Sequence, residues 1–511
     1  MNADARSAPG MMVPGALGVL AALAHILTAD DTYGIFRDEL YYVACSKHLD
    51  WGYVDHPPMI ALLTWMTRGL FGDSLTALRF LPALAAGGTT FLSGLIAREC
   101  GGGRFAMALA GLATMFAPYY IGSFGYLSMN AFDILIWGGM TWCVVRVLRT
   151  GEMRLWLFFG ALAGAGLQNK ISVLFLGAGV VAGLIVTGDF RHFADRRFWL
   201  GGLIAAAIFS PHLIWQSLND WPTLEFMRNA TQNKNLPLTP MAFLSEQVTG
   251  MNPLSVPIVL AGLGFLLFSK RGRTWRAVGV AFVAITALLI SQRAKAYYLS
   301  PAYTMIFAPG AVAAGLLADR AAFRWLKPVA IVLVVASGIA IAPLAKPLLP
   351  VERHVRYAAM LGQAPSTGER KEVARLSQFF ADRIGWRDLA AQVAQVTAAL
   401  PPEDRSRACV FGHNYGNAGA IDFYRDAFAL PPAISGHNSY WLWGPSGCTG
   451  KVMIILGGSR DDYTDSFESV DQAAVFTCVD CMPYENHKPV FVARGMRRPM
   501  EQAWKGTRHY D

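Results

Sequence analysis

Two adjacent carboxylates open the stretch of sequence that is richest in reactive side chains. Asp38 and Glu39 begin it, Tyr41 follows in a helix-like run, and Asp55, His56 and two prolines end it. Apolar segments flank this polar stretch on both sides, and its residue types cannot lie in hydrocarbon. We therefore expect an ordered loop at a membrane surface. Acidic positions brought together there could supply a general base and bind an acceptor, although Asp38 could instead cap the following helix.

A further acidic position lies inside an apolar helix. Asn130 and Asp133 occur near the start of the apolar segment 129–148, directly after Ser128. An ionisable side chain in a membrane-spanning helix is costly unless it faces a cavity or a partner. Asp133 is therefore a candidate catalytic residue. The structural alternative is that Ser128 or Asn130 caps the helix and Asp133 interacts with its first turn.

Isolated cations form the third group of candidates. Lys170, Arg293 and Lys295 fall in short connections between apolar segments, and Tyr297 and Tyr298 follow the last of them. A lipid phosphate or diphosphate at the membrane edge would need such charges, and tyrosine hydroxyls would add donors. We expect these residues to bind phosphate. The alternative for any single cation is an anchor that extends to the membrane surface.

Metal and redox motifs are weaker. Asp38, Glu39, Asp55 and Asp133 could bind a divalent metal, and the sequence leaves open whether the protein has a metal or no cofactor. Cys478 and Cys481 have redox or metal spacing, but the sequence has no second pair at zinc-site distance, so a local disulfide and incidental thiols are the alternatives. His413, His437 and His487 lack the spacing of ligands, which favours structural roles.

The composition indicates that a membrane protein positions these side chains. Of 511 residues, 54% are hydrophobic and 15% charged, whereas soluble domains carry about a quarter charged residues. The net charge of +9 does not indicate nucleic-acid binding, because the basic residues are scattered rather than gathered into one stripe. About eleven apolar segments are long enough to cross a bilayer. They lie near residues 11–29, 74–97, 105–121, 129–148, 155–167, 171–187, 198–216, 253–268, 277–290, 297–318 and 328–344.

The distribution of Lys and Arg predicts the orientation of these segments. Every second connection is basic, which assigns the basic connections to the cytoplasm and the candidate residues to the outer face of the membrane. The N-terminal apolar run lacks a convincing cleavage site, so we expect an uncleaved first span. Membrane lipids are then the immediate partners of the chain.

Beyond about residue 350 the charges increase and the apolar runs shorten, as in a soluble domain. We predict a mainly α, polytopic membrane domain over residues 1–349, with a large first outer loop at 30–73, and a small extracytoplasmic α/β domain over 350–511. The elements expected in the second domain are strands at 408–411 and 452–456 and helices at 369–384 and 389–400.

Three stretches carry a resemblance to a known family. The segments FRDELYYVACSKHLDWGYVDHPPMIALL, MNAFDILIW and RAKAYYLSPAY together resemble the dolichyl-phosphate-mannose-protein mannosyltransferase-like glycosyltransferases of bacteria. These share the GT-C fold with aminoarabinose transferases that act on lipid A. The tail sequence GHNYGNAGAIDFYRDAFALPPAISGHNSYWLWGP also looks like the outer domain of one branch. The resemblance implies a transferase that moves a sugar from a polyprenyl-phosphate carrier to a hydroxyl acceptor on the outer face, inverting the anomeric centre.

The resemblance also implies roles for single residues. Asp38 matches the family's catalytic acidic residue, the proposed base; Glu39 follows it as in the family pair, and Asp133 matches a second acidic position. Asp55 and His56 stand where relatives of the aminoarabinose type often show an acidic and a basic residue before two prolines. The expected substrate-binding residues are Tyr41, Asp55, His56, Asn130, Lys170, Arg293, Lys295 and Tyr297.

Three classes of function remain in view. The first is a glycosyltransferase whose acceptor is a lipid, a glycan or a protein, so lipopolysaccharide modification and protein glycosylation both fit. The second is a transporter or lipid flippase, which would also combine many spans with intramembrane charge, although the sequence has no repeated halves. The third is a sensor or scaffold that binds a partner through the tail. The first predicts that acids from separate stretches meet cations in one cleft at the outer membrane rim.

Overall fold

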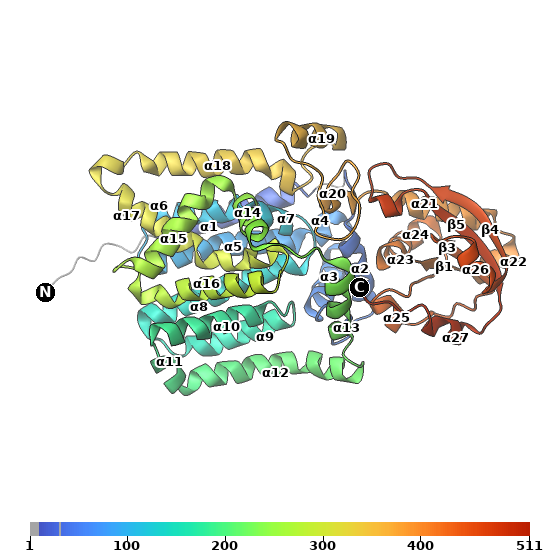
Figure 1. Ribbon diagram of the computed structural model, residues 1–511, viewed down its shortest axis with the longest axis horizontal. Helices are drawn as coiled ribbons and strands as arrows, with labels where there is room; N and C mark the ends of the chain where they lie inside the picture. The colour runs from blue at the N-terminus through green and yellow to red at the C-terminus, as the bar shows by residue number, and fades with distance from the viewer. Residues whose placement is uncertain (1–9, 30–31) are drawn as a thin grey trace. The chain divides into compact units, whose positions relative to one another are not determined.

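The computed structural model describes residues 10–29 and 32–511, which form two compact units, each built from several segments of the chain (Figure 1). The helical unit comprises Met1–Ala29, Thr76–Leu213 and Pro237–Leu348. The mixed unit comprises Asp30–Leu75, Ile214–Leu236 and Leu349–Asp511. The expectation of an uncleaved first span falls partly on residues 1–9, which lie outside the described residues.

The helical unit contains a helix in every apolar segment that the sequence predicts. A membrane-spanning backbone must satisfy its own hydrogen bonds, which helices do. In chain order the elements are α1 (Met12–Leu27), α4 (Leu75–Leu78), α5 (Phe80–Glu99), α6 (Arg104–Met115), α7 (Pro118–Ser123), α8 (Met129–Thr150), α9 (Leu155–Leu167), α10 (Val173–Thr187), α11 (Arg191–Ala194), α12 (Arg196–Leu218), α14 (Pro240–Gly250), η2 (Pro253–Ser255), α15 (Val256–Phe268), η3 (Arg273–Trp275), α16 (Arg276–Ser291), η4 (Ala296–Met305), α17 (Phe307–Ala318), η5 (Ala321–Phe323) and α18 (Leu326–Ala345).

Helix length limits how many of these elements cross a membrane alone. Within residues 10–29 and 32–511, five helices are long and apolar enough, and up to seven if each of two bent pairs counts as one span. The bent pairs are Pro240–Gly250 with Pro253–Phe268, and Ala296–Met305 with Phe307–Ala318. The chain is therefore polytopic. The expected number of about eleven spans also includes shorter apolar helices such as α9 and α10.

Close packing of these helices depends on small residues. Helix α10 packs against α16, and α15 against α17. A Cβ atom on Gly183 would lie 2.1 Å from the carbonyl oxygen of Ala277, and one on Gly310 would lie 2.0 Å from that of Ile258. Larger residues at these two positions would force the helices apart. Small residues at helix crossings are typical of membrane bundles.

The mixed unit is built on a five-stranded sheet of order β2-β1-β3-β5-β4. Strand β1 pairs in parallel with β2 and β3, while β5 is antiparallel to β3 and β4. The strands are β1 (Ala408–Gly412), β2 (Ala433–Ile434), β3 (Val452–Leu456), β4 (Phe467–Phe476) and β5 (Lys488–Met496). The helices are α2 (Arg37–Lys47), α3 (Met59–Phe71), α13 (Pro222–Asn229), η1 (Ala230–Lys234), α19 (Val351–Met360), α20 (Gln378–Ala381), α21 (Trp386–Ala399), α22 (Pro402–Arg407), α23 (Tyr415–Phe423), α24 (Arg425–Phe428), α25 (Ser439–Leu442), α26 (Asp461–Thr464), η6 (Pro483–Glu485) and α27 (Met500–Lys505).

The expected strands at 408–411 and 452–456 and the helix at 389–400 correspond to β1, β3 and α21. The expected helix at 369–384 is wrong, because only Gln378–Ala381 is helical there. Backbone atoms before it bond to a distant segment: Arg370 N donates to Lys234 O at 2.8 Å, and Leu236 N donates to Gly368 O at 3.2 Å. These long-range bonds replace those that a helix would make.

Candidate active site

Helix α2 positions the acid pair at its first turn. Glu39 is fully buried, and its Oε2 atom accepts a hydrogen bond at 2.8 Å from the backbone nitrogen of Phe36, just before the helix. Glu39 therefore satisfies a backbone donor that the helix start would otherwise leave without a partner. The residue that caps the start of α2 is therefore Glu39 and not Asp38. This burial disfavours the catalytic contact expected for Glu39.

Asp38 faces a group of side chains from the tail. The hydroxyl of Tyr415 donates to Asp38 Oδ1 at 2.9 Å, and the guanidinium of Arg37 lies 4.5 Å from the centre of the Tyr415 ring. Arg37 Nη1 also donates to the Tyr484 hydroxyl at 2.9 Å. Burial raises the pKa of Asp38, while Arg37, Tyr415 and Lys234 oppose that rise. A half-buried carboxylate with a raised pKa is suited to accept a proton.

Helix α23 brings Tyr415 to this position. The Oδ1 atom of Asn414 accepts from the backbone nitrogen of Asn417 at 3.0 Å and caps the helix, so Tyr415 is its first residue. Helix α23 packs along α2. A Cβ atom on Gly419 would lie 3.1 Å from the Leu40 Cβ, so a small residue there allows the close approach.

Asp55 belongs to the same network. The Tyr41 hydroxyl lies 2.8 Å from Asp55 Oδ1 and 2.7 Å from Ser439 Oγ, and the Tyr41 ring lies 4.7 Å from the ring of Tyr415. The charge of Asp55 also acts on Asp38. The two acidic positions of the polar stretch are thus neighbours, as their spacing suggested.

His56 is buried beneath this network, with 1% of its surface exposed. Its Nδ1 atom lies 2.8 Å from the carbonyl oxygen of Pro57, and its ring stacks on Tyr53 at 4.7 Å between centroids. Its Nε2 atom faces the Cys45 sulfur at 3.7 Å. These contacts favour a packing role and disfavour the substrate contact expected for His56.

The helical unit holds a second cluster, around Asp133. Asp133 is 1% exposed, and its Oδ1 atom accepts from the Ser172 hydroxyl at 2.7 Å. The Lys170 ammonium lies 4.0 Å from Asp133 Oδ2 and donates to Asn130 Oδ1 at 2.6 Å. Ser128 accepts from the Asn130 backbone nitrogen and caps α8, so the capping alternative holds for Ser128. Asp133 instead pairs with the cation.

Two aromatic rings complete this second cluster. The Lys170 ammonium lies 5.5 Å from the centre of the Tyr297 ring and 5.1 Å from that of Tyr298. The charge of Lys295 acts on Lys170, so these cations are also near one another. Arg293 is exposed in the connection between α16 and η4. Four predicted residues, Asn130, Asp133, Lys170 and Tyr297, thus meet within one unit.

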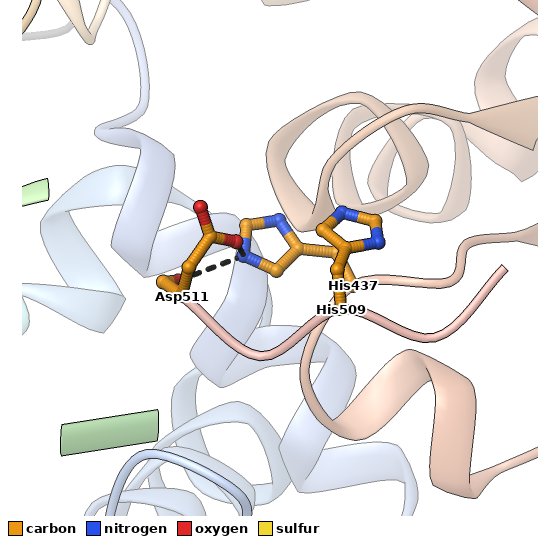
Figure 2. Close-up of side chains that lie close together, drawn as sticks. All are labelled: His437, His509 and Asp511. Atoms are coloured by element: carbon orange, nitrogen blue, oxygen red, sulfur yellow. Dashed lines mark hydrogen bonds and ion pairs between the residues drawn. The ribbon is translucent and has the colours of Figure 1, made fainter. Parts of the chain in front are cut away.

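Three side chains of metal-ligand type lie near one another at the end of the tail. Among the described residues, His437, His509 and Asp511 place ligand atoms within 4.8 Å of one another (Figure 2). However, His437 Nδ1 accepts from the backbone nitrogen of Tyr415 at 3.3 Å, so the ring proton lies on Nε2, which donates to Asp511 O at 2.9 Å. A metal at Nε2 would have to displace that proton. The donor set therefore fits a hydrogen-bonded anchor better than a metal centre.

The two cysteine questions have separate outcomes. Cys409 and Cys448 are joined by a disulfide within the mixed unit. Cys478 and Cys481 carry free thiols, and Cys481 Sγ donates to the Cys478 carbonyl oxygen at 2.9 Å. Of the two alternatives for Cys478 and Cys481, a local disulfide and incidental thiols, the structure therefore shows thiols.

Several site residues could not be found from the sequence. Tyr415 bonds to Asp38 directly, and Ser439 lies 2.7 Å from the Tyr41 hydroxyl. Arg37 lies over the Tyr415 ring and donates to Tyr484. Tyr415 stands inside the tail sequence that carried the family resemblance, but no spacing connects it to Asp38. Ser172 follows Lys170 closely, so its nearness to that cation was the one available signal.

Comparison with known proteins agrees with this architecture. Residues 55–215 match the family model described as dolichyl-phosphate-mannose-protein mannosyltransferase. The lipopolysaccharide core galacturonosyltransferase RgtB of Rhizobium johnstonii is 24% identical over 245 residues, which are 48% of this chain and 47% of that protein. The match therefore spans about half the length of this curated relative.

Two solved structures share the fold. ArnT from Cupriavidus metallidurans, bound to undecaprenyl phosphate, is similar with a TM-score of 0.61 at 17% identity, over 93% of this chain and 97% of that chain. Its apo state gives a TM-score of 0.60 at 16% identity with the same coverage. The predicted resemblance and the predicted GT-C fold, mainly α with a small C-terminal sheet region, are confirmed.

Proposed function

We propose that this chain, whose fold is that of the GT-C transferases, moves a sugar from a polyprenyl-phosphate donor to a hydroxyl group. The observation that carries the proposal is the fold shared over 93% of the chain with an ArnT structure that contains undecaprenyl phosphate. The similarity to RgtB supports a lipopolysaccharide acceptor, while the family match supports a protein acceptor.

Asp38 is the proposed general base. It takes the proton of the acceptor hydroxyl while that oxygen attacks the anomeric carbon. The bond from the anomeric carbon to the phosphate oxygen breaks on the opposite side, its electron pair leaves with the polyprenyl phosphate, and the anomeric centre inverts. The raised pKa of Asp38 and its hydrogen bond from Tyr415 support this role.

Lys170 is the proposed partner of the departing phosphate. An ammonium at that point offsets the negative charge that grows on the leaving group. Arg293 and Lys295 add positive charge from the connection before η4. Asn130 and Asp133 hold Lys170 in place, which supports positioning roles for both of them. Asp133 would then influence the reaction by positioning Lys170 and would not contact the substrate itself.

We propose an extracytoplasmic location for the mixed unit, in a multi-pass protein of a bacterial inner membrane. The Cys409–Cys448 disulfide supports this, because disulfides persist in oxidising compartments. The basic connections of the helical unit support the same orientation. The sugar would then be transferred on the outer face.

Transfer by the reconstituted full chain tests the proposal. With a labelled polyprenyl-phosphate sugar and a lipopolysaccharide acceptor, Asp38→Asn should lower transfer by about 10²- to 10⁴-fold, the usual contribution of a general base. Asp426→Asn, which removes an exposed carboxylate of the same unit, is the matched control. Retained transfer by Asp38→Asn would exclude Asp38 as the base. Lipid translocation by the wild-type chain without sugar transfer would favour the flippase.

A further inference from the structure

A small pocket opens at the other end of the helix that carries Asp38. Its volume is about 200 Å³, and its walls include Lys47 and His48 from the end of α2, Arg425 from α24, and Trp443. All of these residues belong to the mixed unit. The pocket is smaller than those that bind drug-sized molecules, so a ligand of one ring suits it.

One wall of the pocket is aromatic. The rings of His48 and Trp443 stack with centroids 4.4 Å apart and planes 14° apart, and Tyr440 meets Trp443 edge-on at 4.7 Å. Burial, together with the neighbouring Lys47, lowers the pKa of His48, so its ring is neutral at neutral pH. A neutral aromatic surface packs well against the C–H face of a sugar ring.

The pocket lining also carries charge, with an excess of cations. Lys47 Nζ donates to the carbonyl oxygen of Asp422 at 3.2 Å, and the Tyr440 hydroxyl donates to Asp422 Oδ2 at 2.8 Å. Arg425 also acts on Asp422 electrostatically. The lining therefore has two cations, Lys47 and Arg425, and one carboxylate, Asp422, which already accepts a hydrogen bond from Tyr440. The surplus positive charge favours a ligand that carries an acidic group.

The distance to Asp38 follows from helix geometry. Asp38 and Lys47 lie at the two ends of α2, nine residues apart, which corresponds to about 14 Å at 1.5 Å per residue. Between them, Tyr41 lies 6.5 Å from Trp443, measured between ring centres. A ligand in the pocket would be remote from the reacting atoms. An extended acceptor could reach both places.

We propose that this pocket binds an acidic saccharide unit of the acceptor, such as a uronic acid, while a neighbouring hydroxyl of the same acceptor approaches Asp38. This inference rests on the proposed function, because it assigns the acceptor class of that reaction. Lys47 and Arg425 pair with the acidic group, and His48 and Trp443 support the sugar ring.

Binding of glucuronate to the full chain in nanodiscs, followed by saturation-transfer NMR, tests the pocket. The double variant Lys47→Gln, Arg425→Gln should weaken binding at least about tenfold, because it removes two charge-assisted contacts. The matched control Lys451→Gln, Arg460→Gln removes the same charge from exposed residues outside the pocket and should bind as the wild type does. Glucose and inorganic phosphate are the comparison probes.

Each outcome decides the inference. The inference is supported if the wild type binds glucuronate tightly and binds glucose and phosphate more weakly. It also requires that the pocket variant, and not the control variant, loses glucuronate binding. If glucose binds as tightly as glucuronate, the pocket does not select an acidic group. If phosphate binds as tightly as glucuronate, the pocket does not select a sugar. Either result would overturn the inference. Absence of glucuronate binding to the wild type would overturn the site.

Transfer kinetics separate this inference from the proposed function. With an acceptor that contains uronic acid, the pocket variant should raise the acceptor KM at least about tenfold and leave kcat nearly unchanged. A wild-type chain that transfers sugar but shows no such KM effect in the variant would overturn the inference alone. A wild-type chain that binds glucuronate but transfers no sugar would overturn the proposed function, and with it the assignment to an acceptor.

Discussion

The hydrogen bond from Tyr415 to Asp38 gives the most direct test of the proposed chemistry. Tyr415→Phe removes only the hydroxyl, which lies 2.9 Å from Asp38 Oδ1, and keeps the ring over which Arg37 lies at 4.5 Å. A hydrogen bond to a charged group contributes about 1.5–3 kcal/mol. Since about 1.4 kcal/mol corresponds to a tenfold change in rate, we expect transfer at neutral pH to fall about 10- to 100-fold.

The sign of the pH dependence follows from the same contact. The Tyr415 hydroxyl stabilises the ionised form of Asp38 and so lowers its pKa against the opposing effect of burial. Without the hydroxyl, the pKa of Asp38 should rise further, and more of the base should be protonated at any given pH. The acidic limb of the kcat/KM profile should move to higher pH. The deficit of the variant should therefore shrink as the pH rises.

Transfer rates of Tyr415→Phe and wild type, measured in the same reconstituted vesicles from pH 5 to 10, provide the assay. Tyr424→Phe removes a tyrosine hydroxyl at the end of the same helix and serves as the matched control. A deficit of equal size at every pH would mean that Tyr415 acts only through packing. An unchanged profile would refute the assignment of Asp38 as the titrating base.

The other predictions concern the cation, the cap and the disulfide. Lys170→Gln should lower kcat/KM for the donor about 10- to 100-fold, and Lys170→Arg should recover part of it, because the charge but not the geometry is restored. Glu39→Ala should cost about 1–3 kcal/mol of the free energy of unfolding, because it leaves a buried backbone donor without its partner, while transfer per folded molecule stays close to wild type. Replacing both Cys409 and Cys448 by Ser should lower the free energy of unfolding by about 2–4 kcal/mol, as measured by urea denaturation.

Specific results would contradict these three expectations. A normal donor KM and kcat in Lys170→Gln would remove that cation from the leaving-group site. A folded Glu39→Ala variant that has lost transfer would restore a catalytic role for Glu39. Unchanged urea denaturation of the double Ser variant, with the wild-type disulfide verified by mass spectrometry, would show that the cross-link does not stabilise the mixed unit.

The sequence predicted what depends on local pattern. Apolar runs predict helices because a backbone in lipid must bond internally. The role of base that the resemblance gives to Asp38 stays a prediction. Asp133 and Lys170 could be singled out because charge in apolar surroundings is unusual. Their pairing with one another required the fold.

Contacts between distant segments could not be read from the sequence. Glu39 and Asp38 are adjacent acids, yet one caps the helix and the other faces Tyr415, a difference that depends on which side of α2 packs against α23. The tail region before α20 does not form the expected helix, because its backbone hydrogen-bond partners lie in residues 234–236. Pattern rules that read one segment at a time miss such partners.

The way in which the mixed unit is assembled from separate segments has a consequence for its biogenesis. Its α2 region is synthesised early, but Tyr415 and the sheet follow only after the whole helical unit has been made. During that interval the aromatic side chains of the early loop lack the partners that later cover them, and exposed apolar surface of this kind favours aggregation. For the same reason, a fragment that begins at residue 350 would lack α2 and the stretch up to Leu236, and its recombinant production should yield insoluble material.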